Sequence, residues 1–215
     1  MQNKQNTIYT IIGHKGFGKT TLTEILTLMN NKPAIMVDPC GQFISEHKRR
    51  KIFHSFGEFR AWIYNRKNLN IFYEGKLELV VREPNDEEFD EICLISRKIG
   101  KHTLVVDEAD LYAPPSITKN KPFYKLVNMG RHSEVDIITT SRRPARISRD
   151  ITSQTDVVFF ARVLEPNDKD YIKKYIGEQH IKTAETLKKY SFLMIDQERE
   201  PHLIKVSKKS AELIS

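Results

Sequence analysis

The segment from Gly13 to Thr20 carries the residues of this chain that could bind a nucleotide phosphate. Gly13 is followed by four residues and then by Gly18, Lys19 and Thr20, which is the Walker A spacing. Glycines let the backbone curl so that its N–H groups point at phosphate oxygens. We expect Lys19 to reach the β- and γ-phosphates and the Thr20 hydroxyl to bind Mg²⁺. The predicted phosphate-binding residues are Gly13, His14, Lys15, Gly16, Phe17, Gly18, Lys19, Thr20 and Thr21.

Two adjacent carboxylates follow the short apolar segment Leu104–Val106. Asp107, at the end of this expected strand, is placed to hold Mg²⁺ through water, beside Thr20. Glu108 is placed to polarise the attacking water, and a glutamate at this position favours ATP hydrolysis over phosphate transfer to a small molecule. The alternative is that both acids are surface charge.

A parallel sheet is needed to bring the loop and the acids together. Segments of apolar, β-branched residues predict strands at Thr7–Ile12, Ala34–Val37, Leu77–Val81, Leu104–Val106, Val135–Thr140 and Asp156–Ala161, and a terminal hairpin at Tyr190–Asp196 and His202–Val206. Helices are expected at Thr20–Met29, Phe56–Tyr64 and Asn85–Ile99, at the end of Ile117–Met129, and at Asp168–Ile176. Strands that alternate with helices predict an α/β fold with a mostly parallel sheet and helices on both faces.

The length and composition suit one soluble domain. We expect residues 1–215 to form a single motor domain, with a core at about 7–176 and a C-terminal extension at about 177–215. No apolar run approaches the roughly 20 residues of a membrane helix, and the polar start of the chain does not resemble a signal peptide. Cys40 and Cys93 are expected to be buried in a reducing compartment. The net charge of +7 suggests a polyanionic partner.

Four further strings occur in a fixed order: Val37–Phe43, Val106–Asp110, Gly130–His132 and Thr140–Pro144. In this respect the chain resembles the FtsK–HerA superfamily of DNA-pumping ATPases, in which similar strings follow the second, third and fourth sheet strands. The match covers roughly Thr7 to Ile176, and the likeness is strongest to the small genome-packaging ATPases of viruses. The resemblance implies a P-loop NTPase fold of the RecA/ASCE type with a C-terminal β-hairpin, and it implies ATP and Mg²⁺ as ligands.

The resemblance also implies a homo-oligomeric ring, a pentamer or hexamer, in which an arginine of the neighbouring subunit completes each nucleotide site. Such an arginine finger contributes about 10³–10⁵ in rate. Arg131, in the string Gly130–His132, is the candidate finger. Its rivals are Arg142, Arg143 and Arg146.

At the sensor of the γ-phosphate, the chain departs from the family's pattern. Many family members place a glutamine directly before Arg-Pro, and here Arg142 occupies that position. Arg142 is therefore a candidate sensor by its charge, and Thr140 or Ser141 by its hydroxyl. Asp38 matches an acid that follows the second strand in the family, but its Pro-x-Gly context is also that of a plain turn.

Basic clusters are the candidate contacts for double-stranded DNA. A motor that moves any genome must ignore sequence and grip phosphates. The run His47–Lys51 is expected in a loop that could line a pore, and a second run extends from Arg142 to Arg149. The alternative is a solvated charged surface, which is also the reading for the pairs Lys173–Lys174, Lys188–Lys189 and Lys208–Lys209. Trp62 is expected in the core.

The function implied by the resemblance is ATP-driven packaging of a double-stranded viral genome into a capsid. The expected place is the host cytoplasm or the packaging vertex of the virion, with capsid or portal proteins as partners and no stable membrane insertion. A first strand at residue 7 leaves no room for the N-terminal barrel of the cellular HerA helicases. The alternatives are a HerA-like DNA translocase or helicase in conjugation or defence, and a P-loop nucleotide kinase.

Overall fold

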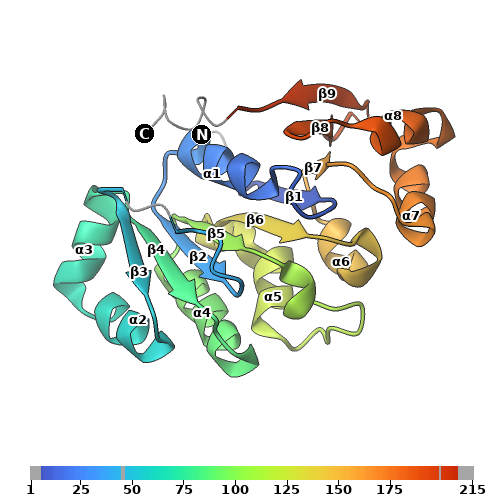
Figure 1. Cartoon of the computed structure of the whole chain (residues 1–215). Helices are drawn as coiled ribbons and strands as arrows, with labels where there is room; N and C mark the ends of the chain where they lie inside the picture. The colour runs from blue at the N-terminus through green and yellow to red at the C-terminus, as the bar shows by residue number, and fades with distance from the viewer. Residues whose placement is uncertain (1–5, 45–46, 199, 208–215) are drawn as a thin grey trace.

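The computed structural model describes residues 6–44, 47–198 and 200–207. Its described part contains one nine-stranded sheet (Figure 1). The strands are β1 Ile8–Ile12, β2 Ala34–Asp38, β3 Arg50–Phe53, β4 Glu78–Arg82, β5 Thr103–Val106, β6 Asp136–Ser141, β7 Val157–Phe160, β8 Ser191–Ile195 and β9 His202–Lys205. The α-helices are α1 Lys19–Asn30, α2 Phe56–Ile63, α3 Arg66–Glu74, α4 Asp86–Ile99, α5 Pro122–Met129, α6 Arg149–Thr152, α7 Pro166–Ile176 and α8 Ile181–Thr186. Short 3₁₀ segments are η1 Ala109–Leu111, η2 Gly130–Ser133, η3 Pro144–Arg146 and η4 Glu178–His180.

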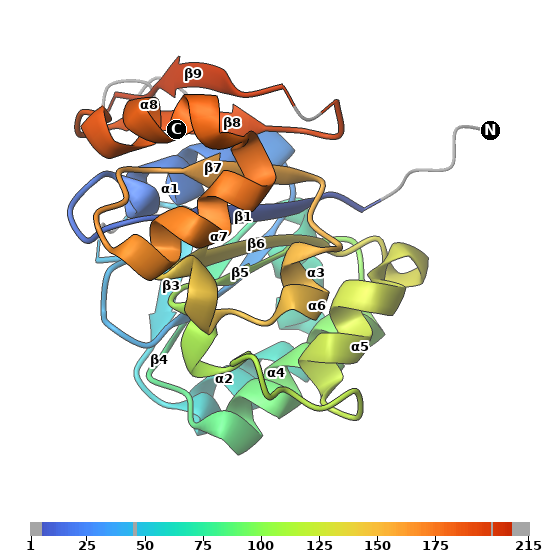
Figure 2. The same ribbon diagram turned by 90° about the vertical axis from the view of Figure 1, so that its right-hand side faces the viewer.

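The strand order across the sheet is β3-β4-β2-β5-β6-β1-β7-β8-β9. Strands β1 to β7 pair in parallel, whereas β8 runs antiparallel to β7 and β9 antiparallel to β8. Figure 2 shows this hairpin at one end of the sheet, beyond β7. The predicted α/β fold, with a mostly parallel sheet and a C-terminal hairpin, is therefore confirmed.

The two faces of the sheet are covered very differently. Helix α1 packs Leu22 and Leu26 on one face, in a core that also contains Ile11 of β1. The other described α-helices contribute to the cores on the opposite face, where Ile8 and Ile12 of β1 point. Since side chains alternate along a strand, β1 is buried on both faces, and the P-loop that follows it starts from a rigid position.

Helix α4 illustrates how sequence sets these elements. Asn85 and Glu88 form a capping box, with Asn85 Oδ1 accepting from Glu88 N at 3.0 Å and Glu88 Oε2 accepting from Asn85 N at 2.9 Å. Acids fill the first turn and Arg97 and Lys98 the last, which complements the helix dipole. The expected boundaries of this helix differ from the observed ones by one residue.

Two elements differ from expectation in the region between β2 and β4. Residues of the basic run His47–Lys51 were expected in a loop, but part of the run forms the edge strand β3. The Arg50 side chain is only 2% exposed, and it donates to Glu78 Oε2 from Nε at 2.9 Å and from Nη2 at 2.7 Å, with Glu24 Oε1 3.1 Å from Nη1. Arg50 thus holds an edge strand to the sheet and is not a free DNA contact.

Helix α3 is the second such element. It begins after Asn65, whose side chain accepts from the backbone N–H of Lys67 and Asn68, and it buries Phe72 completely.

The expectation for the cysteines was wrong at one position: Cys93 is buried, but Cys40 is exposed. Trp62 is partly buried and packs on Phe53, with ring centroids 5.9 Å apart, so the core prediction is confirmed there.

Candidate active site

The P-loop lies at the carboxyl ends of the parallel strands, where ligands bind in open α/β sheets. Gly13 has φ +150, and a Cβ on it would lie 2.6 Å from the Cβ of Ala161, so only glycine fits between the ends of β1 and β7. Lys19 crosses back over the loop, and its Nζ donates to the Gly13 carbonyl oxygen at 2.8 Å. Burial lowers the Lys19 pKa, although Glu108 and Asp107 act in the opposite direction. The lysine is therefore held in place by the loop itself.

Asp107 follows β5, and its carboxylate is almost fully buried. Oδ1 accepts a hydrogen bond from Thr140 Oγ1 at 2.6 Å, whereas Oδ2 has no partner among the described residues. Burial raises the pKa of Asp107 to about 6, opposed by the Thr140 hydrogen bond and reinforced by the nearby Glu108. A buried carboxylate oxygen without a donor is costly, and a bound cation would satisfy it.

Glu108 adopts a left-handed backbone conformation with φ 46, which is uncommon for a residue with a side chain. Its backbone N–H donates to Thr140 Oγ1 at 3.0 Å, so one hydroxyl on β6 orients both acids. The Glu108 carboxylate accepts from Arg142 Nε at 2.6 Å. This hydrogen bond raises the pKa of the Arg142 guanidinium. Arg142 follows β6, the strand that lies between β1 and β5.

These groups surround one pocket of about 230 Å³. Nine of the sequence-predicted site residues line it: Lys15, Gly16, Gly18, Lys19, Thr20, Thr21, Asp107, Glu108 and Arg142. Three further lining residues were not predicted: Gln42, Lys189 and Tyr190. Gln42 follows the Asp38–Gly41 turn, so its position was readable from the motif order. Lys189 and Tyr190 reach the pocket only because β8 pairs with β7.

A second pocket adjoins the first and shares Lys15 and Arg142 with it. His14 and Lys15 line this second pocket of about 320 Å³, together with Arg142, Arg143 and Arg162. Phe17 is partly buried, with the Arg162 guanidinium 5.9 Å from its ring centroid. Five basic side chains thus gather beside the phosphate-binding pocket, together with the carboxylates of Glu165 and Asp168.

The alternatives left open for the sensor are narrowed by the hydrogen bonds. Thr140 is fully buried and uses its hydroxyl on Asp107 and Glu108. Ser141 is also buried, with Oγ 3.0 Å from Asp110 Oδ1. Neither lines the 230 Å³ pocket, whereas Arg142 does.

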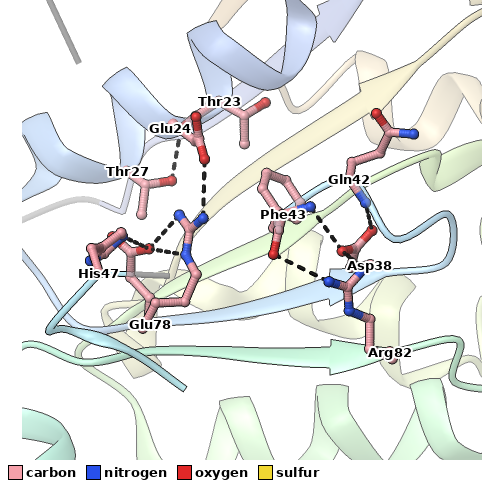
Figure 3. A network of polar contacts seen from close by, with 10 residues as sticks. Thr23, Glu24, Thr27, Asp38, Gln42, Phe43, His47, Glu78 and Arg82 are labelled. Carbon is pink, nitrogen blue, oxygen red and sulfur yellow. Dashed lines mark hydrogen bonds and ion pairs between the residues drawn. The ribbon is translucent and has the colours of Figure 1, made fainter. Parts of the chain in front are cut away.

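Asp38 has a structural role in this arrangement. It is fully buried, and its Oδ1 accepts from Gln42 N at 2.8 Å. Its Oδ2 accepts from Phe43 N at 3.0 Å and from Arg82 Nη1 at 2.8 Å (Figure 3). Both oxygens are occupied, and Asp38 does not line the pocket.

The arginine candidates for a finger separate into two groups. Arg142 and Arg143 are paired within the chain, Arg142 with Glu108 and Arg143 Nε with Asp168 Oδ2 at 3.3 Å. Arg146 is exposed in η3. The side chain of Arg131 lies outside the described part, but its backbone is in η2, just before β6 begins. The pocket lies where β6 ends, so the Arg131 backbone is at the opposite edge of the sheet from it.

The lysines of the other basic clusters are exposed, ion-paired or at the pocket. Lys48 and Lys51 are exposed, Lys173 pairs with Glu178 at 2.7 Å, and Lys189 lines the pocket. The predicted pair Lys208–Lys209 lies outside the described residues. Among the described residues, no group of three or more His, Cys, Asp or Glu side chains is arranged to hold a metal ion without a nucleotide.

Comparison with known proteins agrees with this geometry. The structure is similar to that of the genome-packaging NTPase of Sulfolobus turreted icosahedral virus 2 in complex with ATP-gammaS, with a TM-score of 0.72 and 22% identity over 95% of this chain and 98% of that chain. In sequence, 89 residues are 28% identical to the probable DNA double-strand break repair helicase HerA of Methanocaldococcus jannaschii, over 39% of this chain and 18% of the helicase. A stretch of 73 residues is 29% identical to the DNA double-strand break repair helicase HerA of Pyrococcus furiosus, over 33% of this chain and 13% of the helicase.

The chain therefore has a fold similar to that of a genome-packaging NTPase, and part of its sequence is similar to HerA helicases. The sequence matches span less than a fifth of the length of the two helicases. No protein family model matches the chain. Within the described residues, every helix is too short or too polar to cross a membrane.

Proposed function

We propose that this chain is an ATP-hydrolysing motor that moves double-stranded DNA and packages a viral genome. The observation that carries the proposal is the convergence of Lys19, Asp107 and Glu108 on one pocket at the carboxyl edge of the sheet. The fold is similar to that of a genome-packaging NTPase, with a TM-score of 0.72, and less similar to that of a conjugative coupling protein, with a TM-score of 0.63, which supports packaging. The five basic side chains at the neighbouring pocket outnumber its two carboxylates, Glu165 and Asp168, which supports a polyanionic partner.

The residues present fit Mg²⁺ bound together with ATP. Asp107, whose Oδ2 has no partner among the described residues, and Thr20 both line the pocket, and oxygen ligands of this kind suit the ion. When bound, Mg²⁺ would supply positive charge that neutralises the phosphate oxygens. Lys19 would add a second positive charge at the β- and γ-phosphates.

Glu108 is the proposed general base, which accepts a proton from the attacking water. Its carboxylate is tied to Arg142 at 2.6 Å, and the γ-phosphate is a competing anion for the same guanidinium. Arg142 therefore links phosphate binding to the release of the base, which is how it would act as a sensor. Arg131 of a neighbouring subunit remains the proposed finger, in a ring whose sites lie between subunits.

Stimulation of ATP hydrolysis by DNA tests the proposal. We expect the purified chain to hydrolyse ATP and the rate to rise when double-stranded DNA of any sequence is added. Lys19→Ala should abolish nucleotide binding, whereas Lys67→Ala, which removes an exposed lysine of α3, should change neither property. Hydrolysis that no DNA stimulates, under conditions in which the chain assembles, would contradict the motor assignment.

A HerA-like helicase or translocase outside a virus is the second candidate, because the sequence matches are to repair helicases. The chemistry at Lys19, Asp107 and Glu108 would be the same, so the discriminating test is biological. We expect a gene for a capsid or portal protein beside this one, and the protein in host cytoplasm or at the packaging vertex. A nuclease gene in that place would favour the helicase. Transfer of phosphate to a nucleotide acceptor would instead identify a kinase.

A further inference from the structure

The segment directly before β8 contacts the P-loop. The backbone N–H of Tyr190 donates to the Phe17 carbonyl oxygen at 3.1 Å, and the Tyr190 carbonyl accepts from Val206 N at 2.9 Å. Tyr190 therefore connects the phosphate-binding loop to the C-terminal hairpin, a part of the chain to which the proposed function assigns no role.

The Tyr190 ring lies directly against the loop. Gly18 has φ +95, and a Cβ built on it would lie 2.4 Å from Tyr190 Cδ1, so the ring occupies the space that a larger residue would need. Tyr190 itself has φ 63, which is unusual for an aromatic residue. Strained backbone of this kind is retained mainly where the surrounding structure and the function require the side chain in one place.

The sheet order gives the pocket two distinct sides. Asp107, Glu108 and Arg142 follow β5 and β6, on one side of β1, whereas Tyr190 precedes β8, on the other side. Lys19 is directed to the β- and γ-phosphates, and the proposed general base marks the γ-phosphate end. The nucleoside must therefore leave the P-loop on the side of Tyr190.

We propose that Tyr190 is the contact for the base of the bound nucleotide and that the C-terminal hairpin positions it. This inference rests on the proposed function, because it assumes that ATP occupies the P-loop. An aromatic ring at this end offers apolar area and a π-face to the base, which the polar residues elsewhere in the pocket do not. The Lys189 ammonium lies over the ring, 5.2 Å from its centroid, and adds a positive charge there.

A purely structural role for Tyr190 makes a different prediction. If the ring only supports the P-loop, its removal should weaken every ligand that the loop binds, including one without a base. If the ring contacts the base, its removal should weaken ATP and leave inorganic triphosphate unchanged. The two ligands share the phosphate chain, so their comparison isolates the nucleoside.

The experiment measures the affinities of ATP and of inorganic triphosphate for wild type, Tyr190→Gly and Tyr190→Phe. Glycine keeps the left-handed backbone at this position, and phenylalanine keeps the ring. We expect Tyr190→Gly to bind ATP about 5- to 150-fold more weakly, the range for loss of one base–aromatic stack, with unchanged triphosphate affinity and a near-wild-type Tyr190→Phe. An equal loss for both ligands, or no loss for either, would overturn the inference.

Photolabelling tests the same contact in the unmodified chain, so it does not depend on the folding of a variant. We expect 8-azido-ATP, which reacts from the base, to label the peptide that contains Tyr190, and excess ATP to prevent this. Labelling confined to other peptides would overturn the inference. A wild-type chain that binds neither ATP nor triphosphate would overturn the proposed function as well, whereas failure of the inference alone leaves wild-type binding intact.

Discussion

Asp38 and Asp107 lie at the ends of neighbouring strands, β2 and β5, yet their surroundings differ in one decisive respect. Both are buried, and the backbone N–H of Asp107 donates to the Val37 carbonyl oxygen, one residue before Asp38. Three donors occupy the two oxygens of Asp38. Only Oδ1 of Asp107 has a donor, and Oδ2 is left without one among the described residues.

The difference separates a structural acid from a binding acid. A buried carboxylate that is fully hydrogen-bonded holds the turn after β2 and the Arg82 side chain, and it has no capacity left for a ligand. A buried carboxylate with a free oxygen destabilises the empty protein, so its retention is explained by what it binds. The same reasoning distinguishes two arginines. Arg50 is buried and ion-paired with Glu78 and Glu24, whereas Arg142 is half-exposed at the pocket.

The largest expected effect is on catalysis, from Asp107→Asn. Loss of the charged ligand should lower Mg²⁺-dependent ATP hydrolysis by several kcal/mol of transition-state stabilisation, about a thousandfold or more in rate. The free energy of unfolding without nucleotide should not fall, because the substitution removes a costly buried charge. Steady-state hydrolysis and urea unfolding measure the two properties. Near-wild-type hydrolysis would remove Asp107 from the site.

The opposite pattern is expected for Asp38→Asn. Breaking a buried ion pair and one of the two backbone hydrogen bonds should lower the free energy of unfolding by about 3–5 kcal/mol, measured by urea denaturation. ATP hydrolysis per folded molecule should change far less than in Asp107→Asn. Glu91→Gln is the matched control: it breaks the exposed Arg60–Glu91 pair and should cost at most about 1 kcal/mol. A stable Asp38→Asn variant that has lost activity would reverse the comparison.

The sequence could predict the binding role of Asp107 but not the structural role of Asp38. Lys19, Thr20, Asp107 and Glu108 were identifiable because each belongs to a local motif whose spacing reflects its chemistry. The structural role of Asp38 was not, since its decisive partner Arg82 comes from β4, 44 residues along the chain. A turn motif and a catalytic acid look the same until the long-range donors are known.

The sequence also failed to predict β3, α3 and the place of Tyr190, because contacts with distant segments position them or their own pattern is weak. The segment Arg50–Phe53 contains two basic residues and reads as solvated charge, but Glu78 and Glu24 from distant elements neutralise Arg50 and bury its side chain. Helix α3 is mostly polar and buries only Phe72, so its periodicity is weak. Tyr190 joins the pocket through the pairing of β8 with β7, which no local pattern shows.

The pH dependence of the free energy of unfolding tests whether Asp107 is a costly buried charge. Burial raises the pKa of Asp107 from 3.8 to about 6, so between these values the folded, nucleotide-free protein holds a proton that the unfolded chain does not. This contribution to stability is present below pH 3.8 and is lost as the pH rises through about 6.

Asp107→Asn cannot undergo that loss. Relative to wild type, its free energy of unfolding should increase by up to about 3 kcal/mol between pH 4 and pH 7.5, the equivalent of the pKa change. Urea denaturation of both proteins at the two pH values, without nucleotide or Mg²⁺, measures the difference. A constant difference between the proteins would mean that Asp107 is not a destabilising charge.

The smallest expected effect is the coupling between Arg142 and Glu108. Glu108→Gln should keep ATP binding and lower hydrolysis by about 10²–10⁴-fold. If Arg142 acts through Glu108, adding Arg142→Ala to that variant should cause little further loss, with a coupling energy of about 1–3 kcal/mol in the double-mutant cycle. Rates and ATP affinities of the four proteins measure it.

The buried Arg50–Glu78 pair, away from the pocket, supplies the control. Glu78→Gln disturbs the Arg50–Glu78 pair that holds β3, so it should affect unfolding and leave the rate per folded molecule unchanged. Additive losses at Arg142 and Glu108 would mean that Arg142 contacts the phosphate independently of the base. The 2.6 Å ion pair would then be a contact of the nucleotide-free site alone. Arg142 would be paired within the protein when the site is empty and would bind phosphate when it is occupied.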